Sequence, residues 1–268
     1  MNASQRGRSP STGVSAPQRS ERQRSARRSA VVVASSVAAT GVLYLVPALH
    51  VIAYPLLLLS TFVHEMGHGL AALLVGGEFH QFTMYADGSG VATMAIPMTA
   101  FSSAFSSFGG LVGPAVVGAL LFVVGAFRRL CGPALWVLCG LFVAAEVFYI
   151  RNSFGLVFVG GYALAFFLLA RYGNDLVKQF AVVFLGAQLS LSVFSRADYL
   201  FMQWADTAEG RSPSDVQQIA DALFLPYWFW GGLIALFSAA VVVFGVWFSL
   251  RSIVRHASDA GPSRRRAG

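Results

Sequence analysis

The chain has 268 residues, of which 56% are hydrophobic and 12% are charged, and its mean hydropathy is +0.64. An average soluble domain carries about 25% charged residues, so the composition excludes an ordinary water-soluble globule. The net charge is +7, and most of the excess is arginine near the two ends of the chain. Ser, Gln and Pro accompany these arginines without interleaved aromatic residues, which argues against a nucleic-acid partner and favours contact with an anionic lipid bilayer.

The distribution of charge divides the chain into three parts. We predict a disordered, Arg/Ser-rich cytoplasmic tail over 1–29, a transmembrane domain over 30–250 and a basic C-terminal tail over 251–268. Because about 20 apolar residues span the hydrocarbon core, the uncharged runs predict an all-α polytopic membrane protein with six or seven transmembrane helices. The expected helices lie at about 31–50, 54–76, 106–127, 132–150, 153–170, 177–195 and 223–250.

The same charges predict an orientation. Arg-rich flanks of membrane spans stay in the cytoplasm, so we expect a multi-pass protein of the cell membrane with a cytoplasmic N-terminus. The C-terminal tail is also basic and would lie on the same side, which requires an even number of helices. The seven segments above are odd in number, so the exact helix count stays open between six and seven.

Two segments between the apolar runs differ from helices. Residues 78–94 are rich in β-prone side chains and contain the turn pair Asp87-Gly88, which predicts a short β-hairpin after the second apolar run. A hairpin with unpaired edges cannot face lipid, so we expect it at the membrane interface or lining a cavity. Residues 196–221 hold five of the twelve acids, which favours an extramembrane or interfacial segment with a short helix.

The motif that indicates chemistry lies inside the second apolar run. His64-Glu65-Met66-Gly67-His68 has the pattern H-E-x-x-H, which places both imidazoles on one face of a helix, where they can bind one Zn²⁺. The adjacent Glu65 is then placed to take a proton from a metal-bound water as a general base. The alternative interpretation is a pair of buried histidines and an acid whose polar groups are satisfied by neighbours.

A catalytic zinc site generally has three protein ligands, so a third must come from elsewhere. We assign Asp198 as the third ligand, because it follows the 177–195 run and could turn back toward the histidines. A solvated ion pair with Arg196 is the competing interpretation of this acid.

Three other acids are alternatives for the third ligand. Glu146 lies within a predicted span, where it could also pair with Arg151. Asp215 follows Ser212-Pro213-Ser214, a pattern that favours a helix start with Asp215 as a capping acid at its third position. Asp87 is best explained by the hairpin turn.

These features resemble the site-2-protease-type intramembrane zinc metallopeptidases, particularly their B-type branch. The resemblance covers most of residues 53–235 and implies zinc binding by His64 and His68, with Glu65 as the catalytic base. In the best-characterised members an Asp-Gly motif on a later helix supplies the third ligand. The only Asp-Gly pair here is Asp87-Gly88. The residues that carry the likeness are His64-Glu65-Met66-Gly67-His68-Gly69, Gly76-Gly77, Asp87-Gly88-Ser89-Gly90, Arg151-Asn152-Ser153-Phe154-Gly155, the Asp198 region, Ser214-Asp215 and Pro226-Tyr227-Trp228.

Three functions follow as hypotheses. The first is an intramembrane zinc metalloprotease that hydrolyses peptide bonds of a membrane-protein or peptide substrate, held by strand addition to the 78–94 hairpin. The second is a catalytically inactive relative that binds or scaffolds membrane proteins. The third is a small-solute transporter, which the single charged cluster and the absence of visible internal symmetry disfavour. The sequence does not indicate an oligomeric state.

Overall fold

A computed structural model of the protein describes residues 27, 30–36, 38–43, 46, 50–195 and 197–258. Within these residues, six helices are long and apolar enough to cross a membrane. The expected all-α polytopic fold is therefore confirmed. The first predicted helix corresponds to a shorter apolar helix, Ala30–Leu43, and most of the predicted tail at 1–29 lies outside the described residues. The spans are Ala53–Leu74, Ala100–Gly125, Arg128–Phe148, Ser153–Tyr172, Asp175–Phe201 and Tyr227–Ser252.

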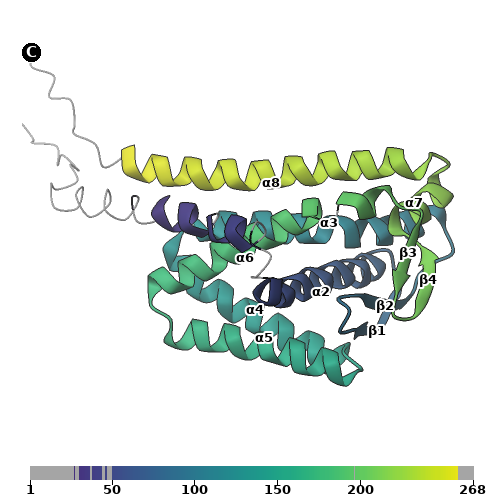
Figure 1. Ribbon diagram of the computed structural model, residues 1–268, viewed down its shortest axis with the longest axis horizontal. Helices are drawn as coiled ribbons and strands as arrows, with labels where there is room; N and C mark the ends of the chain where they lie inside the picture. Colours follow the sequence, from purple (N-terminus) through teal and green to yellow (C-terminus); the bar gives the residue numbers. More distant parts are fainter. Residues whose placement is uncertain are drawn as a thin grey trace, which may run out of the picture.

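The bundle is built around two helices that carry or cover the H-E-x-x-H motif. Helix α2 packs against α3, and α3 in turn contacts α6 and α8 along its length, while α4 and α5 form a pair on the opposite side of α2 (Figure 1). The bounds of these helices are α2 His50–Leu74, α3 Ala100–Gly125, α4 Arg128–Phe148, α5 Ser153–Tyr172, α6 Asp175–Ser195 and α8 Tyr227–Ser258.

Two helix boundaries differ from the expected ones by more than four residues. Helix α3 begins at Ala100 and not near residue 106, because the Thr99 side chain caps it by accepting a hydrogen bond from the Ser102 N–H at 3.1 Å. Helix α8 continues to Ser258, so residues 251–258 of the predicted basic tail are helical. Both differences have the same cause. The uncharged runs mark the part of a helix that lies in the hydrocarbon core, and a helix can extend beyond that core.

Glycines allow α2 and α3 to approach closely. A Cβ added at Gly67 would lie 2.3 Å from the Gly109 carbonyl oxygen, and one at Gly109 would lie 2.5 Å from the Ala71 Cβ. One at Gly110 would lie 2.2 Å from Nε2 of His68. Small residues at a helix interface permit this approach in membranes, and here they bring α3 against the face that carries the motif.

The predicted hairpin is present directly after α2. Strands β1 (Glu78–Met84) and β2 (Gly90–Ala95) pair antiparallel, and the turn between them contains Gly88 with φ 91°. The outer edge of β1 is covered, because the Phe82 N–H donates to the Tyr149 carbonyl at 2.8 Å. The side-chain amide of Asn152 brackets Met84, donating to its carbonyl at 2.6 Å and accepting from its N–H at 3.3 Å. A covered edge is what an apolar environment requires.

A second hairpin, which sequence analysis did not predict, follows α6. A 3-10 helix, η2 (Ala197–Phe201), leads into β3 (Trp204–Thr207) and β4 (Gly210–Pro213), which pair antiparallel. The short helix expected in this region is α7 (Asp215–Leu223). Its apolar face buries Val216 and Ile219 in a small core with Leu111 and Val112 of α3, so α7 is fixed against the helix that covers the motif.

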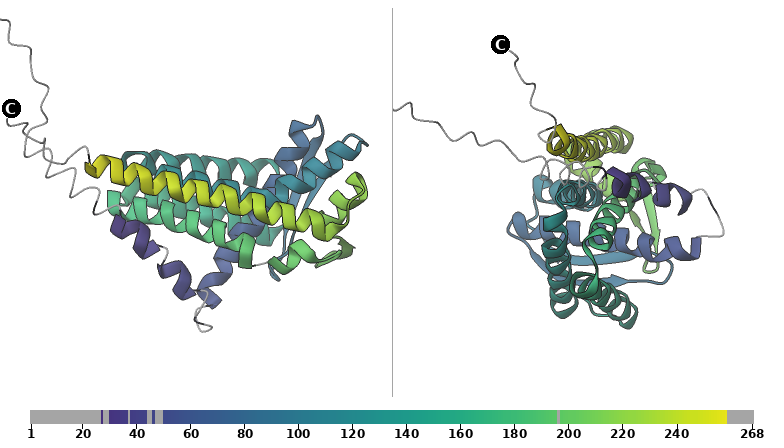
Figure 2. Two further views of the ribbon diagram at one scale, coloured as in Figure 1. Left: turned by 90° about the horizontal axis from the view of Figure 1, so that it is seen from above. Right: turned by 90° about the vertical axis from the view of Figure 1, so that its left-hand side faces the viewer.

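The turns of the two hairpins contact each other. The Tyr85 hydroxyl donates to Oε1 of Glu209 at 2.7 Å, and the Ala208 N–H donates to Oγ of Ser89 at 3.3 Å. The hydrogen bond to Glu209 raises the pKa of Tyr85 above its usual range. Figures 1 and 2 show both hairpins at the end of the bundle away from the C-terminal end of α8.

Candidate metal centre

Consecutive turns of α2 carry the two histidines of the motif. His64 and His68 lie four residues apart, and their Nε2 atoms approach to 3.1 Å. Nδ1 of His68 lies 2.9 Å from the carbonyl oxygen of Ser106 on α3. A carbonyl can only accept, so Nδ1 must carry the proton and a neutral His68 presents a free lone pair at Nε2. Helix α3 therefore sets the tautomer that a metal ligand needs.

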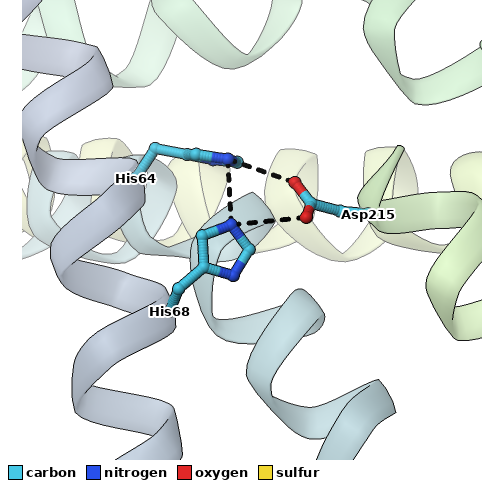
Figure 3. Close-up of side chains that lie close together, drawn as sticks. All are labelled: His64, His68 and Asp215. Atoms are coloured by element: carbon cyan, nitrogen blue, oxygen red, sulfur yellow. Dashed lines mark hydrogen bonds and ion pairs between the residues drawn. The ribbon is translucent and has the colours of Figure 1, made fainter. Parts of the chain in front are cut away.

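The third group comes from α7. Asp215 Oδ2 lies 3.1 Å from Nε2 of His64, and Oδ1 lies 3.4 Å from Nε2 of His68 (Figure 3). Asp215 is the first residue of its helix, directly after the N-cap Ser214, whose side chain accepts from the Gln217 N–H. The N-cap thus aims the start of α7, and with it the Asp215 carboxylate, at the histidines.

The donor set fits a zinc ion. His64, His68 and Asp215 form a group, among the described residues, whose ligand atoms all lie within 4.8 Å of one another. Zn–N and Zn–O distances of about 2.0–2.1 Å in a tetrahedron place ligand atoms about 3.3 Å apart. The two Nε2 atoms lie 3.1 Å apart, and Oδ2 of Asp215 lies 3.1 Å from Nε2 of His64, which is close to this value. The second carboxylate oxygen, Oδ1, lies 3.4 Å from Nε2 of His68. Two imidazole nitrogens and one carboxylate oxygen also match the ligand type of catalytic zinc sites, which use three protein ligands.

The carboxylate is kept ionised by its surroundings. Burial by itself would raise the pKa of Asp215, but the adjacent His68 and His64 outweigh this effect and hold the pKa well below its usual range. Asp215 is 6% exposed and His68 is 7% exposed. Removing one histidine would leave the buried Asp215 carboxylate with fewer partners for its charge.

Glu65 lies beside the group and is also buried, at 8% exposure. Its Oε2 accepts a hydrogen bond from the Ala92 N–H of β2 at 2.9 Å. Ala92 is opposite Phe82 in the β1–β2 register, and both N–H groups point away from the partner strand. The edge of β2 that faces away from β1 therefore runs past the Glu65 carboxylate.

The acid closest to the two histidines is Asp215 and not Asp198. Asp198 lies in η2 and lines a cavity that also contains His64 and Glu65, but it does not belong to the metal-capable group of the described residues, in which the acid is Asp215. The sequence pattern had favoured Asp215 as a capping acid at the third helical position. The cap is Ser214 and Pro213 ends β4, so the Asp215 side chain is available to the site.

The other two candidates have local explanations. Asp87 stabilises the hairpin turn, where its Oδ1 accepts from the N–H and the hydroxyl of Ser89 at 2.8 and 2.7 Å, and these bonds lower its pKa. Glu146 lies on α4 with its carboxylate next to Gly160 of α5. Arg151, its expected partner, donates to backbone carbonyls at the end of α4, including that of Ile150 at 2.9 Å.

Two cavities flank the group. One, of about 450 Å³, is lined by the histidines, Glu65, Asp215, β2 and β4, and the other, of about 370 Å³, is lined by the motif, the first hairpin turn, η2 and β3. The first hairpin was expected at the interface or lining a cavity, and the second alternative is confirmed. The residues that line both cavities are His64, Glu65, Gly90, Tyr199, Ala205 and Thr207.

Asp215 was one of the alternatives for the third ligand in the sequence, whereas Ser106 and Tyr199 were not expected at the site. The Tyr199 hydroxyl donates to Oδ2 of Asp215 at 3.1 Å. The signal for Asp215 was present in the Ser214-Asp215 pair that formed part of the family likeness. No pattern in the sequence singles out Ser106, because it contributes a backbone carbonyl that any residue would offer.

Comparison with known protein families gives one match. The family model for Peptidase M50B-like proteins matches residues 33–245, which includes all six candidate spans almost entirely and every residue of the metal-capable group. No curated protein and no solved structure matches the chain.

Proposed function

Because the chain belongs to the Peptidase M50B-like family, we propose that it is an intramembrane zinc metalloprotease that hydrolyses peptide bonds of membrane-spanning substrates. The observation that carries this proposal is the convergence of His64, His68 and Asp215 beside Glu65, in a cluster whose members are buried except for the partly exposed His64. The resemblance in sequence had implied zinc binding by both histidines and a base role for Glu65. The approach of a third ligand from α7 adds support that the motif alone does not provide.

In the proposed site His64 and His68 would hold zinc through their imidazole nitrogens, and Asp215 would hold it through its carboxylate. Bound zinc supplies Lewis acidity and brings the pKa of water to about 7. Ser106 keeps the His68 ring in the tautomer that leaves Nε2 unprotonated, since its carbonyl oxygen accepts from Nδ1. The chain therefore provides both the ligands and the backbone group that orients one of them.

We assign the proton transfer to Glu65. The Ala92 N–H holds Oε2, so Oε1 is the atom proposed to receive a proton from water and to pass it to the leaving amine. A positioned general base of this kind typically contributes 10²–10⁴-fold to the rate. Burial of Glu65 next to two histidines keeps competing bulk water away from this carboxylate.

The substrate is proposed to bind in extended form along β2. Peptide bonds in a transmembrane helix are protected by their own hydrogen bonds, so a substrate must unwind before it is cut. The outer edge of β2 offers backbone groups for strand addition, and Ala92 on this edge contacts Glu65. A segment paired with β2 would thus pass the base, with β3 and β4 lining the other wall of the cavities.

The proposed setting is the cell membrane, with the bilayer around the six candidate spans and the N-terminus in the cytoplasm. The Arg-rich composition of the first 29 residues supports this orientation. Labelling of single cysteines introduced near residue 20, in intact and in lysed cells, tests it. Labelling in lysed cells alone is expected, and labelling in intact cells would place the N-terminus outside.

The test of the proposed function is co-expression of the native chain with a panel of single-span membrane proteins. Cleavage by the native chain and its loss in Glu65→Gln are expected, because the amide cannot accept the proton. Glu146→Gln is the matched control, since it removes a carboxylate from the membrane domain at a position outside the metal-capable group. Cleavage by Glu65→Gln at the native rate would contradict the proposal, and zinc binding without cleavage of any substrate would favour a non-catalytic binding protein.

A further inference from the structure

Tyr199 contacts two of the three metal-capable residues. Its hydroxyl donates to Oδ2 of Asp215 at 3.1 Å. Its ring stands edge-on to the ring of His64, with centroids 6.2 Å apart and an interplanar angle of 82°. Tyr199 also lines both cavities that flank the site. The Tyr199 side chain therefore borders both cavities and contacts the Asp215 carboxylate.

The hydrogen bond from Tyr199 restricts the rotation of the Asp215 carboxylate. Oδ2 of Asp215 is shared between the Tyr199 hydroxyl and Nε2 of His64, while Oδ1 faces His68. A donor on Oδ2 fixes the rotation of the carboxylate about its axis, so that Oδ1 stays directed at His68. Hydrogen-bond partners of metal ligands act in this way, and their loss typically lowers metal affinity by about 10–100-fold.

Backbone contacts hold both Tyr199 and Asp215, the donor and the acceptor of this hydrogen bond. The Ser214 N–H donates to the Gln203 carbonyl at 2.9 Å, which ties the start of α7 to the chain just after η2. Helix α8 packs tightly on η2, because a Cβ added at Gly231 would lie 1.9 Å from the Leu200 carbonyl oxygen. Tyr199 and Asp215 therefore have little freedom to separate.

We propose that Tyr199 is a positioning residue of the metal centre, which holds the Asp215 carboxylate in the orientation that binds zinc. This inference rests on the proposed zinc site. It assigns to Tyr199 an effect on metal affinity and coordination, carried by its hydroxyl, that is separate from any effect of its ring on packing.

The experiment compares the native full-length protein with Tyr199→Phe, which removes the hydroxyl and keeps the ring. Zinc dissociation constants are measured by competition with a chelator, and the variant is expected to bind zinc at least about 10-fold more weakly. Tyr162→Phe is the matched control, since Tyr162 packs among Phe142, Phe158 and Phe166 away from the site. This control is expected to bind zinc as the native protein does.

A second measurement uses cobalt(II) in place of zinc, because its visible spectrum reports the arrangement of the ligands. The spectrum is expected to change in Tyr199→Phe and to stay unchanged in Tyr162→Phe. Native zinc affinity and a native cobalt spectrum in Tyr199→Phe would overturn the inference while leaving the zinc site intact. Loss of folding in Tyr199→Phe, seen by gel filtration, would contradict a role confined to the site. A native protein that binds no zinc would overturn the proposed function together with this inference.

Discussion

Asp215 Oδ2 lies 3.1 Å from Nε2 of His64, so a nine-residue helix late in the chain completes a site that begins on α2. The contact depends on the packing of α7 against α3 and on the cap that starts α7. It places a carboxylate beside the two histidines of the H-E-x-x-H motif. The predictions below test this contact and the elements that hold it.

Replacing Asp215 by Asn is expected to weaken zinc binding more than about 100-fold, because a direct ligand contributes more than the 10–100-fold typical of outer partners. The amide has lost the negative charge and is a poor zinc ligand. Asp198→Asn is the matched control, because it changes the neighbouring acid in the cavity wall and should leave zinc affinity unchanged. Chelator competition on the purified variants measures both. The reverse order of effects would return the ligand role to Asp198.

Removing the cap of α7 is expected to weaken the site without touching a ligand. Ser214→Ala loses the bond from the Gln217 N–H and the bond that the Ser214 hydroxyl donates to the Met202 carbonyl, and loss of a cap alone costs about 1 kcal/mol. If the same free energy of about 1 kcal/mol is lost from the zinc-binding conformation of α7, zinc affinity drops about 5-fold. Thr99→Ala removes the equivalent cap from α3 and should change zinc affinity less. Equal zinc affinities for the two variants would show that the cap does not position Asp215.

A methyl group at Gly110 is expected to displace His68. The added Cβ would lie 2.2 Å from Nε2 of His68, and overpacking of this kind costs about 1–3 kcal/mol. Zinc binding and thermal stability should both fall in Gly110→Ala. Gly140→Ala is the control, since a Cβ at Gly140 meets nothing within 4 Å. Native zinc binding by Gly110→Ala would mean that the two helices separate easily.

The edge of β2 is expected to matter for cleavage more than for metal binding. Ala92→Pro removes the N–H that Glu65 accepts and blocks strand addition at that point. The substitution removes no bond to β1, because this N–H points outward. Cleavage of a single-span substrate should fall at least about 10-fold, while zinc content stays native. Unchanged cleavage would exclude β2 as the surface that holds the substrate.

Local features of the fold could be predicted from the sequence. The spacing of His64 and His68 places them on one helix face. Asp87-Gly88 predicts a turn, because a hairpin turn depends mainly on the residues next to it in the sequence. The second hairpin lacked such a signal, because its turn is Ala208-Glu209 and it ends at Pro213, neither of which is typical of a hairpin.

Contacts between distant segments could not be predicted in this way. Asp215 has the sequence of a helix start wherever the helix lies, and its approach to His64 depends on the packing of α7 on α3. The hydrogen bond from Tyr199 depends in turn on that placement. Local sequence therefore predicted two of the three proposed ligands and the proposed base, and the third required the tertiary structure.

The most direct test of the account is the zinc content of the purified full-length protein, measured by mass spectrometry of the metal after expression in zinc-supplemented medium. We predict one zinc per chain in the native protein and in His80→Ala, whose histidine lies on β1 outside the group. His64→Ala should contain far less. A native protein that contains no zinc, or a His64→Ala variant that keeps it, would contradict the central claim.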